Sequence, residues 1–185
     1  PQQVPEEDYD DAGETVSYEG YAPRKLRLGR PHPDQVLENS TLSAVDPPDI
    51  TYEPDLPAAT INDCKLSDLQ LEVVTYAGQA HSQPRLQDGC RPGFFLGDGA
   101  GVGKGRQLAG VLLDNWRRGR RRHLWVSASN DLIVDARRDL RDIGAGHLPC
   151  FSITDFPVRQ LRIPRKEGVL FMTYASLVGR AGRAK

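Results

Sequence analysis

Hydrophobic residues change their spacing along the chain, and this change divides it into two parts. From about residue 64, apolar side chains recur at helical spacing in three segments, and short apolar runs lie between these segments. Spacings of three and four residues place side chains on one face of a helix, whereas an apolar run without alternation is typical of a strand covered on both faces. Strands that alternate with helices predict an α/β fold in which helices cover a parallel sheet.

The predicted helices span LSDLQLEVVTYAGQA (66–80), residues 104–116 and NDLIVDARRDLRDI (130–143). Their expected buried positions are Leu66, Leu69, Val73, Tyr76, Ala77 and Ala80, then Leu108, Val111, Leu112 and Trp116, then Ile133, Ala136, Leu140 and Ile143. Ser67 or Asp68 is expected to cap the first helix and Ser129 or Asn130 the third, while Gly119 closes the second. The predicted strands are 94–96, 124–128, a weak one within 149–153, and 168–174.

The first sixty residues lack this periodicity and are rich in Pro, Asp and Glu. PHPDQV, DPPDI and EPDLP each place a proline where regular structure has to stop. We therefore predict an acidic disordered tail over 1–20, an extended irregular arm over 21–62 and a folded α/β lobe over 63–185. The arm is expected to lie over the lobe rather than to fold alone.

Charge and cysteine content exclude several classes of protein. The net charge of the 185 residues is −1, and the densest basic cluster is WRRGRRRH (116–123). This cluster is typical of a solvated helix end, which basic residues stabilise; the alternative is a nucleic-acid contact or a nuclear import signal. Cys64, Cys90 and Cys150 fit no metal-binding spacing and no closed disulfide set. Neither a membrane-spanning run nor a signal peptide is expected.

The stretch GDGAGVGKGR (97–106) places four glycines in seven positions just before a lysine. Glycines allow backbone N–H groups to converge, and the start of the helix that follows adds a positive dipole end. Lys104 would reach the β- and γ-phosphates of a nucleotide as a mobile charge. We therefore predict a phosphate-binding loop.

The loop departs from the general pattern G-x-x-x-x-G-K-[ST] at two positions. Asp98 stands in place of the first glycine, and Gly105 in place of the Ser or Thr that binds magnesium. The glycines do not have the spacing of a dinucleotide-binding G-x-G-x-x-G. A glycine turn with only a structural role remains the alternative.

These segments resemble the strawberry notch family, nuclear proteins with a helicase-like ATPase core. The resemblance is carried by GDGAGVGKGR, by LSDLQLEVVTYA before it, by LWVSASNDLIVDARRDLRDIGA and GVLFMTYASLVG after it, and by RKLRLGRPHPDQVLENSTLSAVDPPDITYE upstream. It covers about residues 20–180 and implies an incomplete RecA-like P-loop lobe of the Swi2/Snf2-type branch of superfamily two helicases. Asp98, Gly101, Gly103 and Lys104 match that branch's motif D-E-x-G-x-G-K-T. Gly105 departs from it, although the strawberry notch family itself carries glycine here.

The resemblance implies roles for individual residues. The expected ATP-binding set is Asp98, Gly99, Gly101, Val102, Gly103, Lys104, Gly105, Arg106 and Gln70. Because Gly105 lacks a hydroxyl, Mg²⁺ is expected to be held indirectly, through water, by the nucleotide phosphates or by an acidic residue elsewhere. Gln70 would read the adenine edge; the alternative is a polar residue on the wet side of its helix. Arg106 would reach a phosphate or lie exposed. The expected nucleic-acid set is Ser127, Ser129, Asn130 and Thr173, and helix capping is the alternative role.

The function implied by the resemblance is ATP binding within a nuclear regulator of transcription that acts on chromatin or DNA together with transcription regulators. An acidic D-E-x-H run and a second lobe are expected downstream of GVLFMTYASLVG, so the 185 residues alone are not expected to hydrolyse ATP, and no catalytic residue is assigned. The first alternative is a non-catalytic co-regulator scaffold with a degenerate nucleotide site, which Gly105 motivates. The second is an α/β domain whose loop binds another anion.

Overall fold

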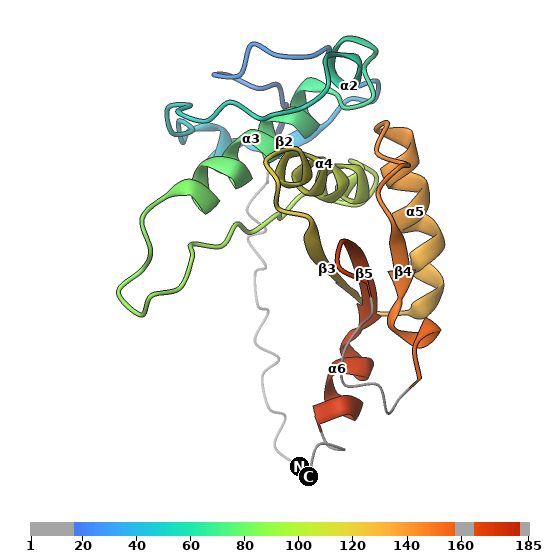
Figure 1. The fold of residues 1–185 in the computed structure, drawn as a ribbon. Coiled ribbons are helices and arrows are strands. Elements are labelled where there is room, and N and C mark those ends of the chain that lie inside the picture. Colours follow the sequence, from blue (N-terminus) through green and yellow to red (C-terminus); the bar gives the residue numbers. More distant parts are fainter. Residues whose placement is uncertain (1–16, 158–164, 182–185) are drawn as a thin grey trace, which may run out of the picture.

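A three-stranded parallel sheet lies at the centre of the computed structural model, which describes residues 17–157 and 165–181. Its strands are β3 (Arg122–Ser127), β4 (Cys150–Ser152) and β5 (Gly168–Thr173), in the order β3-β5-β4 (Figure 1). The register pairs Arg122 with Gly168 at one end and Ser127 with Thr173 at the other. The predicted parallel sheet and three of its strands are confirmed.

Helices cover the sheet and enclose the core. They are α3 (Asp68–Ser82), α4 (Lys104–Arg117), α5 (Ile133–Asp142) and α6 (Tyr174–Ala181), with the 3₁₀ turns η1 (Asn130–Leu132) and η2 (Ile153–Asp155). The α4 helix packs against both α3 and α5, and α5 lies alongside β4 (Figure 1). The core contains Leu71 and Val74 of α3, Leu113 of α4, Leu140 of α5 and Val169 of β5. The predicted α/β class is therefore confirmed.

The predicted caps of α3 and α4 are confirmed, whereas the predicted cap of the third helix caps the 3₁₀ turn η1 that precedes α5. Ser67 caps α3 in a reciprocal capping box with Gln70, because each side chain bonds the other residue's backbone N–H. Ser129 accepts a hydrogen bond from the backbone of Asp131 at the start of η1. Gly119, with φ of +82°, follows the last turn of α4 and donates to the Trp116 carbonyl.

The buried faces of two helices were predicted only in part. In α4, Leu108 is 44% exposed, whereas Ala109 and Leu113 are buried, because α4 contacts helices on two sides. In α3, Leu69 and Ala77 are buried as predicted. The predicted Val73 and Tyr76 are only half-buried, and the most deeply buried apolar residues are Leu71 and Val74. A helix that is covered on several sides does not show its deepest face in its periodicity.

The strand predicted at 94–96 does not form. These residues are in no helix or strand, and Phe95 is 90% exposed. A strand needs a neighbour for its backbone hydrogen bonds, and within the described ranges the sheet ends at β3 without pairing this segment. Irregular chain, rather than a strand of the sheet, therefore leads into the predicted phosphate-binding loop.

The region before α3 is largely irregular and lies on the lobe. It contains a short antiparallel pair, β1 (Tyr18–Gly20) and β2 (Leu37–Asn39), and the short helices α1 (Ser40–Ser43) and α2 (Ala58–Asn62). The Tyr52 ring packs so closely on Gly78 of α3 that a Cβ there would lie 2.1 Å from a ring carbon. Most of the predicted tail, residues 1–16, lies outside the described residues. No helix in the described ranges is long and apolar enough to cross a membrane.

Candidate nucleotide-binding site

Residues 97–105, called the glycine loop below, turn sharply into α4. Gly101 and Gly103 have φ values of +91° and +84°, which favour glycine. A Cβ added at Gly99 or Gly101 would meet no atom within 4 Å, so this side of the loop faces open space. The loop therefore combines a glycine-dependent turn with room for a ligand.

The start of α4 leaves backbone donors available. Gly103 is its N-cap and provides no side chain, and the first helical bond runs from the Gln107 N–H to the Gly103 carbonyl at 3.2 Å. In the described part of the chain, the amides of residues 104–106 have no recorded hydrogen-bond partner. Free amides at the positive end of a 14-residue helix favour an anion such as phosphate.

Lys104 lies across the loop. Its ammonium donates to the Asp98 carbonyl at 2.9 Å and to the Gly99 carbonyl at 2.6 Å. These bonds use backbone oxygens, and no carboxylate of the described residues pairs with the ammonium, so its charge remains available to a phosphate.

Gln107 supports the loop from inside and was missed in the sequence. It is fully buried, its Nε2 donates to Asp98 Oδ2 at 2.8 Å, and its Oε1 has no partner within 17–157 and 165–181. The signal that could have revealed it is its position three residues after Lys104, on the same side of α4. Asp98, a predicted site residue, is thus fixed by its side chain while its carbonyl holds Lys104.

Gln70 is buried beside the loop, so the alternative of a polar residue on the wet side of the helix is wrong. Its Oε1 accepts from the Ser67 N–H at 3.1 Å, and its Nε2 donates to the Val102 carbonyl at 3.0 Å. These bonds connect α3 directly to the glycine loop. Adenine recognition by Gln70 stays a prediction.

Two carboxylates of α5 lie against the first turn of α4. Arg106 pairs with Asp142 at 2.8 Å, which connects α4 to α5 rather than leaving the arginine free. Asp139 approaches Gly105 so closely that a Cβ built there would lie 1.9 Å from Asp139 Oδ2. Burial raises the pKa of Asp139, and the neighbouring Arg138 guanidinium opposes this shift. Glycine is therefore required at position 105 by the packing of α5.

Two cavities flank the glycine loop where the arm crosses it. One, of about 340 Å³, is lined by Tyr21, Glu38, Glu72, Asp98 and Val102 among others. Burial raises the pKa of Glu72, and its hydrogen bond from the Tyr21 hydroxyl opposes the shift. The other, of about 300 Å³, lies between residues 32–37 and residues 99–102. These cavities provide space for the nucleoside part of a nucleotide whose phosphates lie on the loop.

The predicted nucleic-acid residues gather at the carboxyl ends of the strands. Ser127 lies opposite Thr173 in the parallel register, and Thr173 is buried and bonded to Ser176. Ser129 and Asn130 are exposed where η1 begins, and Ser129 acts as a cap. The glycine loop instead contacts α5 at Asp139, about 9 Å along that helix from Ile133. Nucleic-acid contact at these residues stays a prediction.

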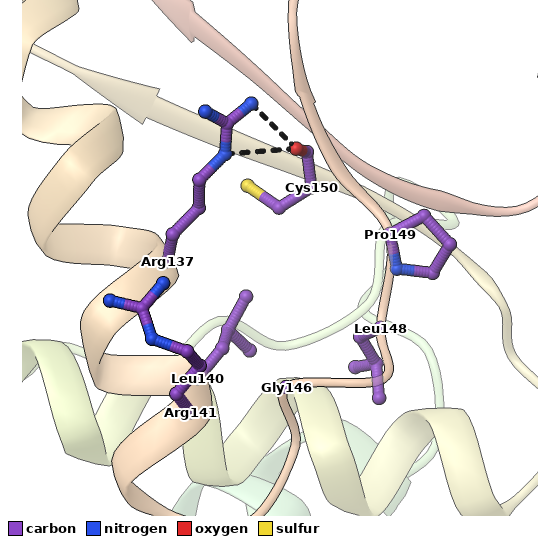
Figure 2. Close-up of a pocket in the computed structure, with 7 residues that line it drawn as sticks. All are labelled: Arg137, Leu140, Arg141, Gly146, Leu148, Pro149 and Cys150. Carbon is purple, nitrogen blue, oxygen red and sulfur yellow. Dashed lines mark hydrogen bonds between the residues drawn. The ribbon is translucent and has the colours of Figure 1, made fainter.

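Two other charged regions are separate from the loop. A cavity of about 280 Å³ lies between α5 and β4, where Arg137 donates to the Cys150 carbonyl at 2.9 Å (Figure 2). In the basic cluster at the end of α4, Arg117 pairs with Asp55 at 2.7 Å and Arg121 with Glu167 at 3.4 Å. These ion pairs support the role of a solvated helix end.

Comparison with known proteins gives the family. The model of the "P-loop containing NTP hydrolase pore-1" family matches residues 31–185. The chain belongs to this family. It is 47% identical over 182 residues to Protein strawberry notch of Drosophila melanogaster and 48% identical over 178 residues to Protein strawberry notch homolog 1 of Rattus norvegicus, covering 96% and 94% of this chain. It is 46% identical over 177 residues, 94% of the chain, to Protein FORGETTER 1 of Arabidopsis thaliana.

The predicted resemblance to the strawberry notch family is confirmed by these matches. The chain spans only 11% of the Drosophila relative, 14% of the rat relative and 13% of the Arabidopsis relative. No solved structure matches the chain.

Proposed function

We propose that the chain is the ATP-binding part of a helicase-like, strawberry notch-type regulator, with the triphosphate on the glycine loop. The observation that carries this proposal is the arrangement at the start of α4. There the Lys104 ammonium has no carboxylate partner, and the amides of residues 104–106 have no recorded partner among the described residues. The family match supports the same assignment.

The residues present fit a nucleotide accompanied by Mg²⁺ only if the phosphates bring most of the metal's ligands. In the described ranges no group of three His, Cys, Asp or Glu side chains is placed to hold a metal. Magnesium bound with a nucleotide takes one or two protein carboxylates and completes its shell with phosphate oxygens and water. When bound, it would neutralise phosphate charge, while Lys104 and the α4 amides orient the phosphates.

The wider role in this proposal is nuclear regulation of transcription on chromatin or DNA, with transcription regulators as partners. Its support is the resemblance to the strawberry notch family. The proposed contacts to a nucleic-acid backbone lie together at the carboxyl end of the sheet, and they are Ser127, Ser129, Asn130 and Thr173.

Nucleotide affinity of the full-length protein tests the proposal. We expect Lys104→Ala to weaken binding of a fluorescent ATP analogue by about ten- to a hundredfold, because a charge-assisted contact to phosphate is lost. The matched control is Lys166→Ala, which removes an exposed lysine elsewhere. Equal affinity of the wild-type and Lys104→Ala proteins would rule out the glycine loop as the nucleotide site.

A non-catalytic scaffold with a degenerate nucleotide site is the second candidate. The observation that favours it is Gly105, which lacks the metal-binding hydroxyl and leaves no room for one beside Asp139. ATP hydrolysis by the full-length protein, measured with and without DNA, separates the two candidates. Turnover that Lys104→Ala abolishes favours the ATPase, and nucleotide binding without turnover favours the scaffold.

A further inference from the structure

The contact between Gly105 and Asp139 concerns cation binding by a P-loop that lacks the Ser or Thr hydroxyl. A Cβ at position 105 would lie 1.9 Å from Asp139 Oδ2 and 2.9 Å from its Cγ. The hydroxyl oxygen of a serine or threonine is attached directly to Cβ. The Asp139 carboxylate therefore fills the space in which a P-loop normally carries its metal-binding oxygen.

The Asp139 carboxylate is largely buried beside Gly105. The Asp139 side chain is 13% exposed, and its one ion pair with a residue that the structure describes, Arg138, is long at 3.5 Å. Arg138 also pairs with Asp135 at 2.8 Å, so its charge is shared. The bond between Arg106 and Asp142, one turn further along α5, connects the same two helices. Asp139 is thus held beside the phosphate-binding end of α4 with only weak neutralisation of its charge.

A carboxylate at this position is unfavourable for a bare triphosphate. Like charges a few ångströms apart repel, whereas a divalent cation between a carboxylate and phosphate oxygens is attracted to both. Magnesium favours a small number of protein carboxylates combined with phosphate oxygens. The combination of the Asp139 carboxylate and phosphate oxygens therefore favours a divalent cation that binds together with the nucleotide.

We propose that Asp139 replaces the missing P-loop hydroxyl and positions the divalent cation that accompanies the nucleotide phosphates. This inference rests on the proposed nucleotide site and goes beyond it by assigning a metal-positioning residue on a different helix. It also explains why position 105 is glycine rather than Ser or Thr: Asp139 of α5 supplies the metal-binding oxygen instead.

The test measures binding to the full-length protein and does not depend on turnover. Affinity for a non-hydrolysable fluorescent ATP analogue is measured in Mg²⁺ and in EDTA, and Mn²⁺ binding in the presence of the analogue is followed by electron paramagnetic resonance. We expect Asp139→Asn to weaken Mn²⁺ binding by about ten- to a hundredfold, the range typical of lost metal-site contacts. We also expect its affinity in EDTA to equal or exceed that of the wild type, because a repulsive charge is gone.

Two further variants keep the result interpretable. Asp131→Asn removes an exposed carboxylate just before α5 and should behave as the wild type. The double variant Gly105→Thr with Asp139→Ala restores a hydroxyl and clears the space for it, so it should recover the gain in affinity from Mg²⁺. Gly105→Thr alone should fold poorly because its Cβ meets Asp139.

The outcomes separate this inference from the proposed function. If Asp139→Asn keeps the wild-type gain from Mg²⁺ and the wild-type Mn²⁺ affinity, the role of Asp139 is refuted while the nucleotide site stands. The role is also refuted if the folded double variant, confirmed by circular dichroism, gains no affinity from Mg²⁺. If the wild-type protein binds no nucleotide in either buffer, the proposed function fails and this inference falls with it.

Discussion

At the scale of single residues, the glycine loop is defined by its conformation and by a few close contacts. Gly103 has φ of +84°, and a Cβ there would lie 2.5 Å from Gln70 Nε2, the atom that donates to the Val102 carbonyl. Gly99 differs, because its φ is not in the left-handed region and no atom lies within 4 Å of an added Cβ. Gly99 therefore has room for a side chain and Gly103 does not, although both belong to the same glycine-rich stretch of the sequence.

Replacing Gly103 with alanine should lower the free energy of unfolding by about 1–2 kcal/mol or more, because a left-handed backbone strains an L-residue and Gln70 has to move. Gly99→Ala should change it by less than about 0.5 kcal/mol. Urea denaturation of both variants measures the difference. Equal destabilisation by the two substitutions would show that the conformation of Gly103 is not required.

At the scale of elements, the sequence predicted every helix longer than ten residues, because amphipathic spacing and cap residues agree in each of them. Ser67 and Gly119 are local signals and were read correctly. The failures were non-local. The buried face of α4 depends on contacts with α3 and α5, and the strand at 94–96 depends on a neighbour that the described chain does not supply. The glycine loop was visible from composition, whereas Gln107 and Asp139 contact it only through tertiary packing.

A buried carboxylate of α4 accepts several of the hydrogen bonds that connect the arm to this helix. Asp114 is 1% exposed and accepts from the Tyr52 hydroxyl at 2.6 Å, the Asp55 N–H at 2.7 Å and Arg118 Nε at 3.0 Å. Asp114→Ala should cost about 3–5 kcal/mol of stability, because three donors lose their acceptor. Arg117→Ala, which breaks only an exposed pair with Asp55, should cost less than about 1 kcal/mol. Thermal or urea unfolding compares the two, and similar losses would contradict this role of Asp114.

At the scale of the whole molecule, tyrosines attach the N-terminal region to the lobe, and their ionisation lowers the stability of the folded state at high pH. Burial, together with the hydrogen bond to Asp114, raises the pKa of Tyr52 to about 12 from an ordinary value of 10.0. Burial and the bond to Glu72 also raise the pKa of Tyr21. A phenol whose pKa is higher in the folded state than in the unfolded state stabilises the fold, and this contribution is fully present below pH 10.

Stability should therefore fall as the pH rises from 10 to 12, because the unfolded chain loses these protons first. Urea unfolding at successive pH values across this range measures the slope, and Tyr52→Phe should make it shallower. A pH dependence unchanged in Tyr52→Phe would contradict this account of how the arm is held.

The central claim is that the backbone amides at the start of α4 bind the phosphates of a nucleotide. Hydrogen–deuterium exchange of the full-length protein, read by mass spectrometry with and without a non-hydrolysable ATP analogue and Mg²⁺, tests it most directly. We predict slower exchange in peptides that cover residues 98–106, and loss of this protection in Lys104→Ala. Saturating nucleotide that leaves exchange in this segment unchanged would contradict the claim.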